Sequence, residues 1–417
     1  MRATVASPRP ANGFDVGRVR QDFPSLRQTI HGRPLVYLDT AASAQKPDAV
    51  IDEIARVLRE DYANVHRGIY ELSQRATDLH EGARRKVQRL LNAADSREIV
   101  FTRNATEGIN LVAQSFVRPR FDSGDEILVT TMEHHANIVP WQLLGDQIGT
   151  RLVVAPINDE GELLLDEFEH RLTSRTRLVS VPWVSNALGT VNPVHDIVEV
   201  AHRRGVPVLI DAAQAVQHMP VDVRELDCEF LVFSGHKAYG PSGIGVLYGK
   251  ADLLESMPPY QGGGDMIASV SFEGTEFNDI PYKFEAGTPA IEAAAGLAAA
   301  IDYLEGLGLA NIAAHESELL AYGTRAMQQV PGLRMVGTAR DKCSVLSFVM
   351  DGAHPQDIGT LLDLDGVAVR TGHHCAQPVI ERLGHSATTR ASLGLYNTQE
   401  DMDALVASLR RVASMFA

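Results

Sequence analysis

The sequence has few cysteines, no excess of basic residues and no long apolar run. Only Cys228, Cys343 and Cys375 occur among 417 residues, and three widely spaced cysteines predict neither a disulfide framework nor a metal site. The formal net charge of −15 argues against nucleic acid or an anionic membrane as a partner, because both bind basic surfaces. No apolar run reaches the length of a membrane span, and the N-terminus lacks the apolar core of a signal peptide. We therefore expect a cytoplasmic protein.

The pattern of apolar and polar residues predicts an α/β protein. Apolar residues make up 45% and charged residues 22% of the chain, which is typical of a globular protein. Short apolar runs alternate with helical periodicity up to about residue 250, which indicates a mainly parallel sheet covered on both faces. An Ala-rich helix beginning near residue 290 then leads into a smaller α+β unit.

Two predicted strands end in residues that suit one cofactor. The run Leu231–Phe233 leads through Ser234 and His236 to Lys237, and the run Val206–Ile210 ends in Asp211. Burial disfavours a charged lysine, so a lysine at a strand tip suits a covalent bond to an aldehyde cofactor. Pyridoxal phosphate needs such a lysine and a carboxylate beside its ring nitrogen. The alternatives are a surface-loop lysine and an aspartate that caps a helix.

Other polar residues also follow predicted strands. Thr106 follows the strand 99–101 at a strand-to-helix turn, a usual phosphate cradle, although a helix N-cap explains it equally well. His134 could stack on a flat ring or, less favourably, form half of a metal-binding pair with His135. Asn186 follows a further strand, and His66 lies in a loop that serves either a site or only solvent. Ligands bind at the carboxyl ends of parallel strands, so we expect these residues to converge.

The smaller unit contains a second reactive stretch around Cys375. This cysteine lies in a loop rich in Gly, His and Pro, where neighbouring histidines and Arg370 favour the reactive thiolate. Cys228 and Cys343 border apolar strands and are interpreted as structural. The guanidinium of Arg390 suits a substrate carboxylate, although a salt bridge is the alternative. Thr288, followed by proline, is a natural helix N-cap.

With these residues assembled, the chain resembles the cysteine desulfurases of the SufS type, which are fold-type I pyridoxal phosphate enzymes of the class V aminotransferase family. The resemblance extends from about residue 22 to the C-terminus. The last of its motifs resembles the Arg-x-Gly-His-His-Cys signature of the group II branch. The motifs are Thr106–Asn110, Glu133–Asn137, Asp211–Gln214, Ser234–Lys237 and Arg370–Cys375. Ala105 stands where relatives often have threonine.

The resemblance implies a large cofactor-binding domain over residues 39–289, with a mainly parallel sheet of the seven-stranded type covered by helices. It also implies a connecting helix over 290–306 and a smaller α+β domain over 307–417 that carries Cys375. We expect residues 1–21 to be a flexible extension and residues 22–38 to pack with the small domain.

The resemblance also implies a role for each candidate site residue. Lys237 binds the cofactor and moves the substrate proton, Asp211 pairs with the ring nitrogen, and His134 stacks on the ring. Gln214 and Asn186 flank the ring oxygen. The phosphate is held by Ala105, Thr106, Ser234 and His236, with Thr288 from the other subunit of a homodimer. The substrate carboxylate is bound by Arg390 and Asn186, with Arg370 and His66 also at the substrate site.

The implied reaction converts L-cysteine to L-alanine and leaves the sulfur on Cys375 as a persulfide. A small acceptor protein of the SufE or SufU type would then take this sulfur for iron–sulfur cluster assembly. Selenocysteine lyase or cysteine sulfinate desulfinase activity is the nearest alternative, because these substrates lose their leaving group more easily and their reactions depend less on the thiol of Cys375. Aminotransferase activity does not explain the cysteine in the loop, and a scaffold role without a cofactor does not explain Lys237 and Asp211.

Overall fold

The structure, a computed structural model, describes residues 14–416. Most of the expected flexible extension lies outside these residues. The expectation is wrong from Val16 onward, where α1 (Val16–Gln21) begins. Asp15 caps this helix, Val19 is its buried residue, and Arg20 forms an ion pair with Asp401 near the C-terminus. These contacts fix the segment on the body of the protein.

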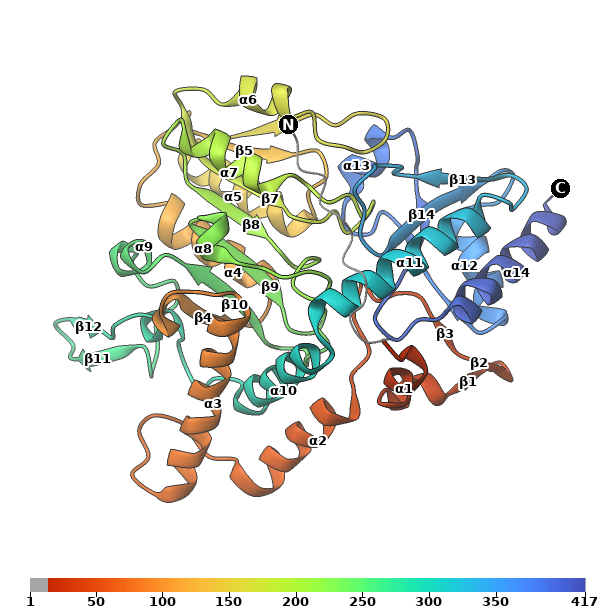
Figure 1. Cartoon of the computed structure of the whole chain (residues 1–417). Coiled ribbons are helices and arrows are strands. Elements are labelled where there is room, and N and C mark those ends of the chain that lie inside the picture. Colours follow the sequence, from red (N-terminus) through yellow and green to blue (C-terminus); the bar gives the residue numbers. More distant parts are fainter. Residues whose placement is uncertain (1–13, 417) are drawn as a thin grey trace.

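A seven-stranded sheet forms the centre of the larger part of the molecule (Figure 1). Its strand order is β4-β10-β9-β8-β7-β5-β6, and β10 is antiparallel to both of its neighbours while the other pairs are parallel. The predicted mainly parallel α/β sheet is therefore confirmed. The strands are β4 (Ile99–Thr102), β5 (Glu126–Thr130), β6 (Arg151–Ala155), β7 (Thr176–Pro182), β8 (Val208–Asp211), β9 (Phe230–Ser234) and β10 (Gly245–Gly249).

Both faces of this sheet are buried, which explains why its strands read as continuous apolar runs. Leu231 and Phe233 of β9 pack into one core, whereas Phe230 and Val232 pack into the other. The first core is covered by α3 (Glu71–Leu90), α6 (Leu165–Arg171), α7 (Val194–His202), α8 (Val223–Leu226) and α10 (Ile291–Leu307). The second is covered by α4 (Ala105–Leu111), which continues as a π-helix to Val117, α5 (Val139–Ile148) and α9 (Ala251–Ser256).

A smaller antiparallel sheet has the order β13-β14-β17-β16 and packs against helices to form a separate core. The strand β3 (Val36–Tyr37) pairs in parallel with β15 (Val367–Ala368), so the red N-terminal segment that contains β3 lies beside the blue C-terminal part in Figure 1. The other elements are β13 (Leu333–Val336), β14 (Val345–Met350), β16 (Arg370–Gly372), β17 (Thr388–Ser392), α11 (Leu309–Met327), α12 (Pro355–Leu364), α13 (Gln377–Arg382) and α14 (Gln399–Met415).

One local prediction needs correction. Thr288 is not the N-cap of α10, because the first helical bond runs from Ala294 N–H to the carbonyl of Ala290. The helix α2 (Asp48–Arg56) continues as a π-helical turn to Asp61. Strands β11 (Ile267–Val270) and β12 (Thr275–Phe277) form an exposed hairpin.

Within residues 14–416, no single helix has both the length and the hydropathy of a membrane span. Only α10 and α11 taken together pass that test, and they are bent by 75° relative to each other.

Candidate active site

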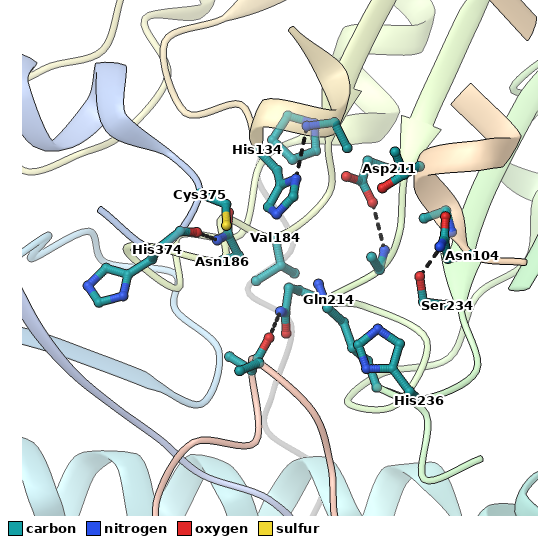
Figure 2. Close-up of a pocket in the computed structure, with 18 of the residues that line it drawn as sticks. Asn104, His134, Val184, Asn186, Asp211, Gln214, Ser234, His236, His374 and Cys375 are labelled. Carbon is teal, nitrogen blue, oxygen red and sulfur yellow. Dashed lines mark hydrogen bonds between the residues drawn. The ribbon is translucent and has the colours of Figure 1, made fainter. Parts of the chain in front are cut away.

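A cavity of about 190 Å³ lies where the carboxyl ends of the large sheet meet the smaller sheet. Polar residues from β4, β5, β7, β8 and β9, or from the turns that follow them, line one side. Residues of β16, the Cys375 loop and β17 line the other (Figure 2). The predicted residues that line it are Ala105, Thr106, His134, Asn186, Asp211, Gln214, Ser234, His236, Lys237, Arg370, Cys375 and Arg390. The convergence predicted from the strand ends is therefore present in the structure.

Asp211 ends β8 and Lys237 follows the adjacent strand β9, and the two side chains influence each other's charge. Lys237 follows β9 in a tight turn, where its N–H donates to the carbonyl of Ser234 (3.2 Å). Burial lowers the pKa of Lys237, and the charge of Asp211 opposes this effect. Burial raises the pKa of Asp211, whereas Lys237 and a hydrogen bond from Ala213 N–H (2.9 Å) lower it. The pair thus places a desolvated amine and a desolvated carboxyl on one cavity.

The end of the cavity near α4 presents hydroxyl and backbone groups. Asn104 is the N-cap of α4, since its side chain accepts from Glu107 N–H (2.9 Å), so the N-cap reading of Thr106 is wrong. Ala105 N–H donates to Ser234 Oγ (2.9 Å). Burial, followed by the charges of Lys237 and a second lysine, lowers the pKa of His236 to about 4, so its imidazole is neutral at pH 7.

His134 lies at the end of β5 as a neutral imidazole. Its Nδ1 accepts a hydrogen bond from Ala136 N–H (3.0 Å), which leaves the proton on Nε2. Burial lowers its pKa to about 3, with the charge of Lys237 as a further cause. His135 instead accepts from Gln377 N–H (3.1 Å), and neither histidine belongs to the two clusters of possible metal ligands found among residues 14–416. The two imidazoles therefore accept hydrogen bonds from different backbone N–H groups.

The Cys375 loop is held in an unusual backbone conformation. His374 and Cys375 have positive φ angles of 54° and 57°, which side-chain-bearing residues seldom adopt. Asn186, which follows β7, donates to the carbonyl of His374 (2.6 Å), and the N–H of His135, which follows β5, donates to the carbonyl of Cys375 (2.7 Å). Two segments of the large-sheet side therefore hold the loop in place. Arg370 places a guanidinium nitrogen 3.5 Å from Cys375 Sγ. Figure 2 shows Cys375 beside Asn186, with His134 nearby.

Arg390 in β17 is almost completely buried, with 1% of its surface exposed. Its Nη2 lies 3.0 Å from Asp39 Oδ1, and its Nη1 donates to the carbonyl of Asn186 (2.8 Å). Its Nε has no hydrogen-bond partner within the described part of the chain. The guanidinium is thus held by two protein groups and keeps unused donors at the cavity that it lines.

Two predicted residues lie elsewhere in this chain. Thr288 lines a second cavity together with Arg103 and Glu107. His66 lies in a third, where its Nε2 is 3.0 Å from Glu81 and its Nδ1 is 3.7 Å from Asp265. Within one chain, His66 does not line the cavity of Lys237, because the loop before α3 faces the β11–β12 hairpin instead.

The sequence reasoning missed several residues at or beside the cavity. Ala41 accepts a hydrogen bond from Gln214 Nε2 (2.7 Å) through its carbonyl, and Asp39 pairs with Arg390. Glu133 is fully buried behind His134, and burial raises its pKa to about 8 although Thr130 and Asn137 donate to it. No local pattern around Asp39 and Ala41 indicates that this segment reaches the site.

Comparisons with known proteins agree with this geometry. The aminotransferase class V family model matches residues 36–405. The chain is 51% identical to a cysteine desulfurase of Dickeya dadantii, covering 97% of this chain and 98% of that protein. It is also 51% identical to a cysteine desulfurase of Synechococcus elongatus over 98% of this chain. This chain spans only 65% of the length of the Synechococcus elongatus protein and 66% of the length of the probable cysteine desulfurase 1 of Mycobacterium leprae.

Solved structures of similar proteins cover the whole fold. The crystal structure of the Escherichia coli cysteine desulfurase CsdA in its S-sulfonic acid form matches with a TM-score of 0.91 and 41% identity, covering 97% of this chain and all of that one. The apo structure of a cysteine desulfurase from Thermococcus onnurineus also matches with a TM-score of 0.91, at 36% identity, covering 99% of this chain and all of that one.

Proposed function

We propose that this chain, which belongs to the class V aminotransferase family, is a cysteine desulfurase that moves sulfur from L-cysteine to Cys375 and releases L-alanine. One observation carries the proposal. Lys237, from the end of a large-sheet strand, and Cys375, from a loop of the smaller sheet's side, line the same cavity. A transaminase needs only the lysine, whereas sulfur transfer also needs a nucleophilic thiol close to the sulfur atom of the substrate.

The residues of the cavity fit pyridoxal phosphate, the cofactor of this family. Lys237 would bind its aldehyde and Asp211 would keep its ring nitrogen protonated, because both groups are desolvated and lie on adjacent strands. The neutral imidazole of His134 would stack on the ring. Thr106, Ser234, His236 and the backbone at Ala105 would hold the phosphate, and Gln214 and Asn186 would flank the ring oxygen.

The protein's own residues then have distinct tasks. Arg390 binds the carboxylate of cysteine through the donors that its protein partners leave free, with Asn186 beside it. The cofactor, when bound, supplies an electron sink that weakens the bond between the substrate's carbon and sulfur. Lys237 moves the proton at the substrate's α-carbon. Arg370 supports the Cys375 thiolate, which attacks the substrate sulfur.

The sulfur transfer balances without an outside oxidant. A sulfur–sulfur bond forms as the carbon–sulfur bond breaks, and the electron pair of the broken bond stays on the substrate carbon. That carbon takes up a proton and becomes the methyl group of alanine, while Cys375 holds the sulfur as a persulfide.

We further propose a cytoplasmic SufS-type enzyme that acts as a homodimer and delivers its persulfide to a small SufE- or SufU-type protein for iron–sulfur cluster assembly. The Arg370–Cys375 motif supports the SufS assignment. The position of Thr288 and His66 outside their own chain's cavity supports their action in the partner subunit's site. The domain boundaries at residues 39, 290 and 307 also remain our proposal.

The decisive experiment measures alanine and reducible sulfide formed from cysteine by the wild type and three variants. We expect Lys237→Ala and Cys375→Ser each to lose at least about a hundredfold in turnover, because each removes a reacting group. Cys343→Ser is the matched control, since Cys343 does not line the cavity, and it should retain full turnover. Wild-type turnover of cysteine by Cys375→Ser would refute the thiol's role. Turnover of selenocysteine alone would instead favour the lyase alternative.

A further inference from the structure

We propose that Lys46 is a positioning residue that fixes the turn carrying Lys237 and thereby sets the protein's affinity for pyridoxal phosphate. This inference rests on the proposed function, but it concerns a residue outside the cavity. Lys46 lies just before α2, in the segment that connects β3 to that helix. It does not line the cavity that holds Lys237.

The contacts of Lys46 converge on one peptide group. Its Nζ donates to the carbonyl of His236 (2.8 Å) and to that of Ala44 (2.6 Å). Ala44 N–H donates to the same His236 carbonyl (3.1 Å), and Ser43 Oγ lies 3.4 Å from it. This carbonyl belongs to the peptide bond that joins His236 to Lys237. Lys46 and its neighbours therefore hold the backbone carbonyl that immediately precedes Lys237.

The charge of Lys46 is costly in this position. Within residues 14–416 it forms no ion pair with a carboxylate, and burial lowers its pKa to about 8. It also lies at the N-terminal end of α2, where the helix dipole disfavours a cation. Neither solubility nor the stability of α2 explains a desolvated cation here. The two carbonyl bonds do explain it, because bonds from an ammonium group are stronger than neutral ones.

Lys46 also affects the group next to the cofactor lysine electrostatically. Its charge contributes to the low pKa of His236, whose Nδ1 lies 3.2 Å from Ser43 Oγ. The same segment reaches the substrate end of the cavity, where Asp39 pairs with Arg390. Lys46 thus holds in place the C-terminal end of a segment that contacts His236 at one end of the site and Arg390 at the other.

The test compares pyridoxal phosphate binding by apo-protein variants. Lys46→Met keeps a side chain of similar length but removes the charge and both hydrogen bonds. We expect the dissociation constant for pyridoxal phosphate to rise about tenfold, which corresponds to about 1.4 kcal/mol. Lys46→Arg restores a cation that can reach both carbonyls, and its dissociation constant should return to within about threefold of the wild-type value. Lys86→Met is the control, because Lys86 pairs with Asp302 on α10, away from the cavity. It should bind as the wild type does.

Two further readouts separate positioning from a general loss of stability. In the apo-protein, backbone amides of residues 234–239 should exchange hydrogen faster in Lys46→Met, while those of β5 remain unchanged. In the loaded protein, the pH titration of the visible absorbance should shift in Lys46→Met and return in Lys46→Arg. Unchanged binding and unchanged exchange would overturn the inference. Weaker binding by Lys46→Met with no cysteine turnover by the wild type would overturn the proposed function alone. If Lys46→Met does not fold, unchanged binding and exchange in Lys46→Gln, which lacks the charge, would overturn the inference.

Discussion

The ion pair between Arg390 and Asp39 provides a test of stability and substrate binding at the same residue. Replacing Arg390 by methionine removes one charge-assisted bond to Asp39 and another to the carbonyl of Asn186. Such bonds contribute about 1.5–3 kcal/mol each, and breaking a buried pair costs about 3–5 kcal/mol. The side chain of Asp39 is 23% exposed, so water can partly solvate the stranded carboxylate. We therefore expect the free energy of unfolding of Arg390→Met to fall by about 3 kcal/mol.

A double-mutant cycle isolates the pair from the other contacts of Arg390. Asp39→Asn alone keeps the size of the side chain and leaves the guanidinium in place, and the double variant removes both charges. Urea unfolding of the four apo-proteins should give a coupling free energy of about 2 kcal/mol, because in the double variant no carboxylate is stranded. A cost below about 1 kcal/mol for Arg390→Met would refute the reasoning that this guanidinium is held mainly by its charged partner.

The same variants test substrate binding. If Arg390 binds the carboxylate of cysteine, Arg390→Met should lower kcat/KM about a hundredfold, the equivalent of about 2.8 kcal/mol. Arg390→Lys keeps the charge but loses the planar fork, and it should lose only about tenfold. An unchanged KM for cysteine in Arg390→Lys and Arg390→Met would show that another group recognises the carboxylate.

Two further predictions concern the backbone and the pH dependence of stability. Gly189 has φ +77°, and a Cβ there would lie 2.6 Å from the carbonyl oxygen of Cys343. Gly189→Ala should therefore lower the free energy of unfolding, measured with urea, by about 2 kcal/mol or more. Gly243 has φ +84° but open space around it, so Gly243→Ala should lower the same free energy by only about 1 kcal/mol. His374 is 3% exposed, and burial, with Arg390 and Arg370 nearby, lowers its pKa to about 3. The unfolded state therefore binds the proton first, and this residue's contribution is lost as pH falls from 6.5 toward 3. Between pH 7 and pH 5 the wild type should lose about 2 kcal/mol more than His374→Gln, and equal losses would contradict this assignment.

The sequence allowed the large-sheet side of the site to be predicted because that side depends on local order. Each polar residue follows an apolar run, and parallel strands bring their carboxyl ends to one edge. Asp211 and Lys237 needed only that rule, since β8 and β9 are neighbours. Cys375 stood out by its loop composition, and the structure places it in the same cavity.

The contributions of the N-terminal segment could not be predicted in this way. Asp39 and Lys46 act through partners about 350 and 190 residues away in sequence, and no periodicity specifies such contacts. The capping errors have a different cause. Asn104 and Thr106 are both good N-cap residues, and only the backbone path decides which of them accepts the first free N–H group.

The charge of the cavity shows why composition gives so little information about ligands. The chain carries a net charge of −15, yet the described residues that line the cavity include three basic side chains, Lys237, Arg370 and Arg390, and one carboxylate, Asp211. The lining histidines do not alter this balance at pH 7, because burial lowers the pKa values of His134, His236 and His374 to about 3–4. The local potential therefore favours a phosphate and a carboxylate even though the protein as a whole repels anions. The overall charge argues against nucleic acid, which needs an extended basic surface, but it does not test whether a small anion binds where three basic side chains converge.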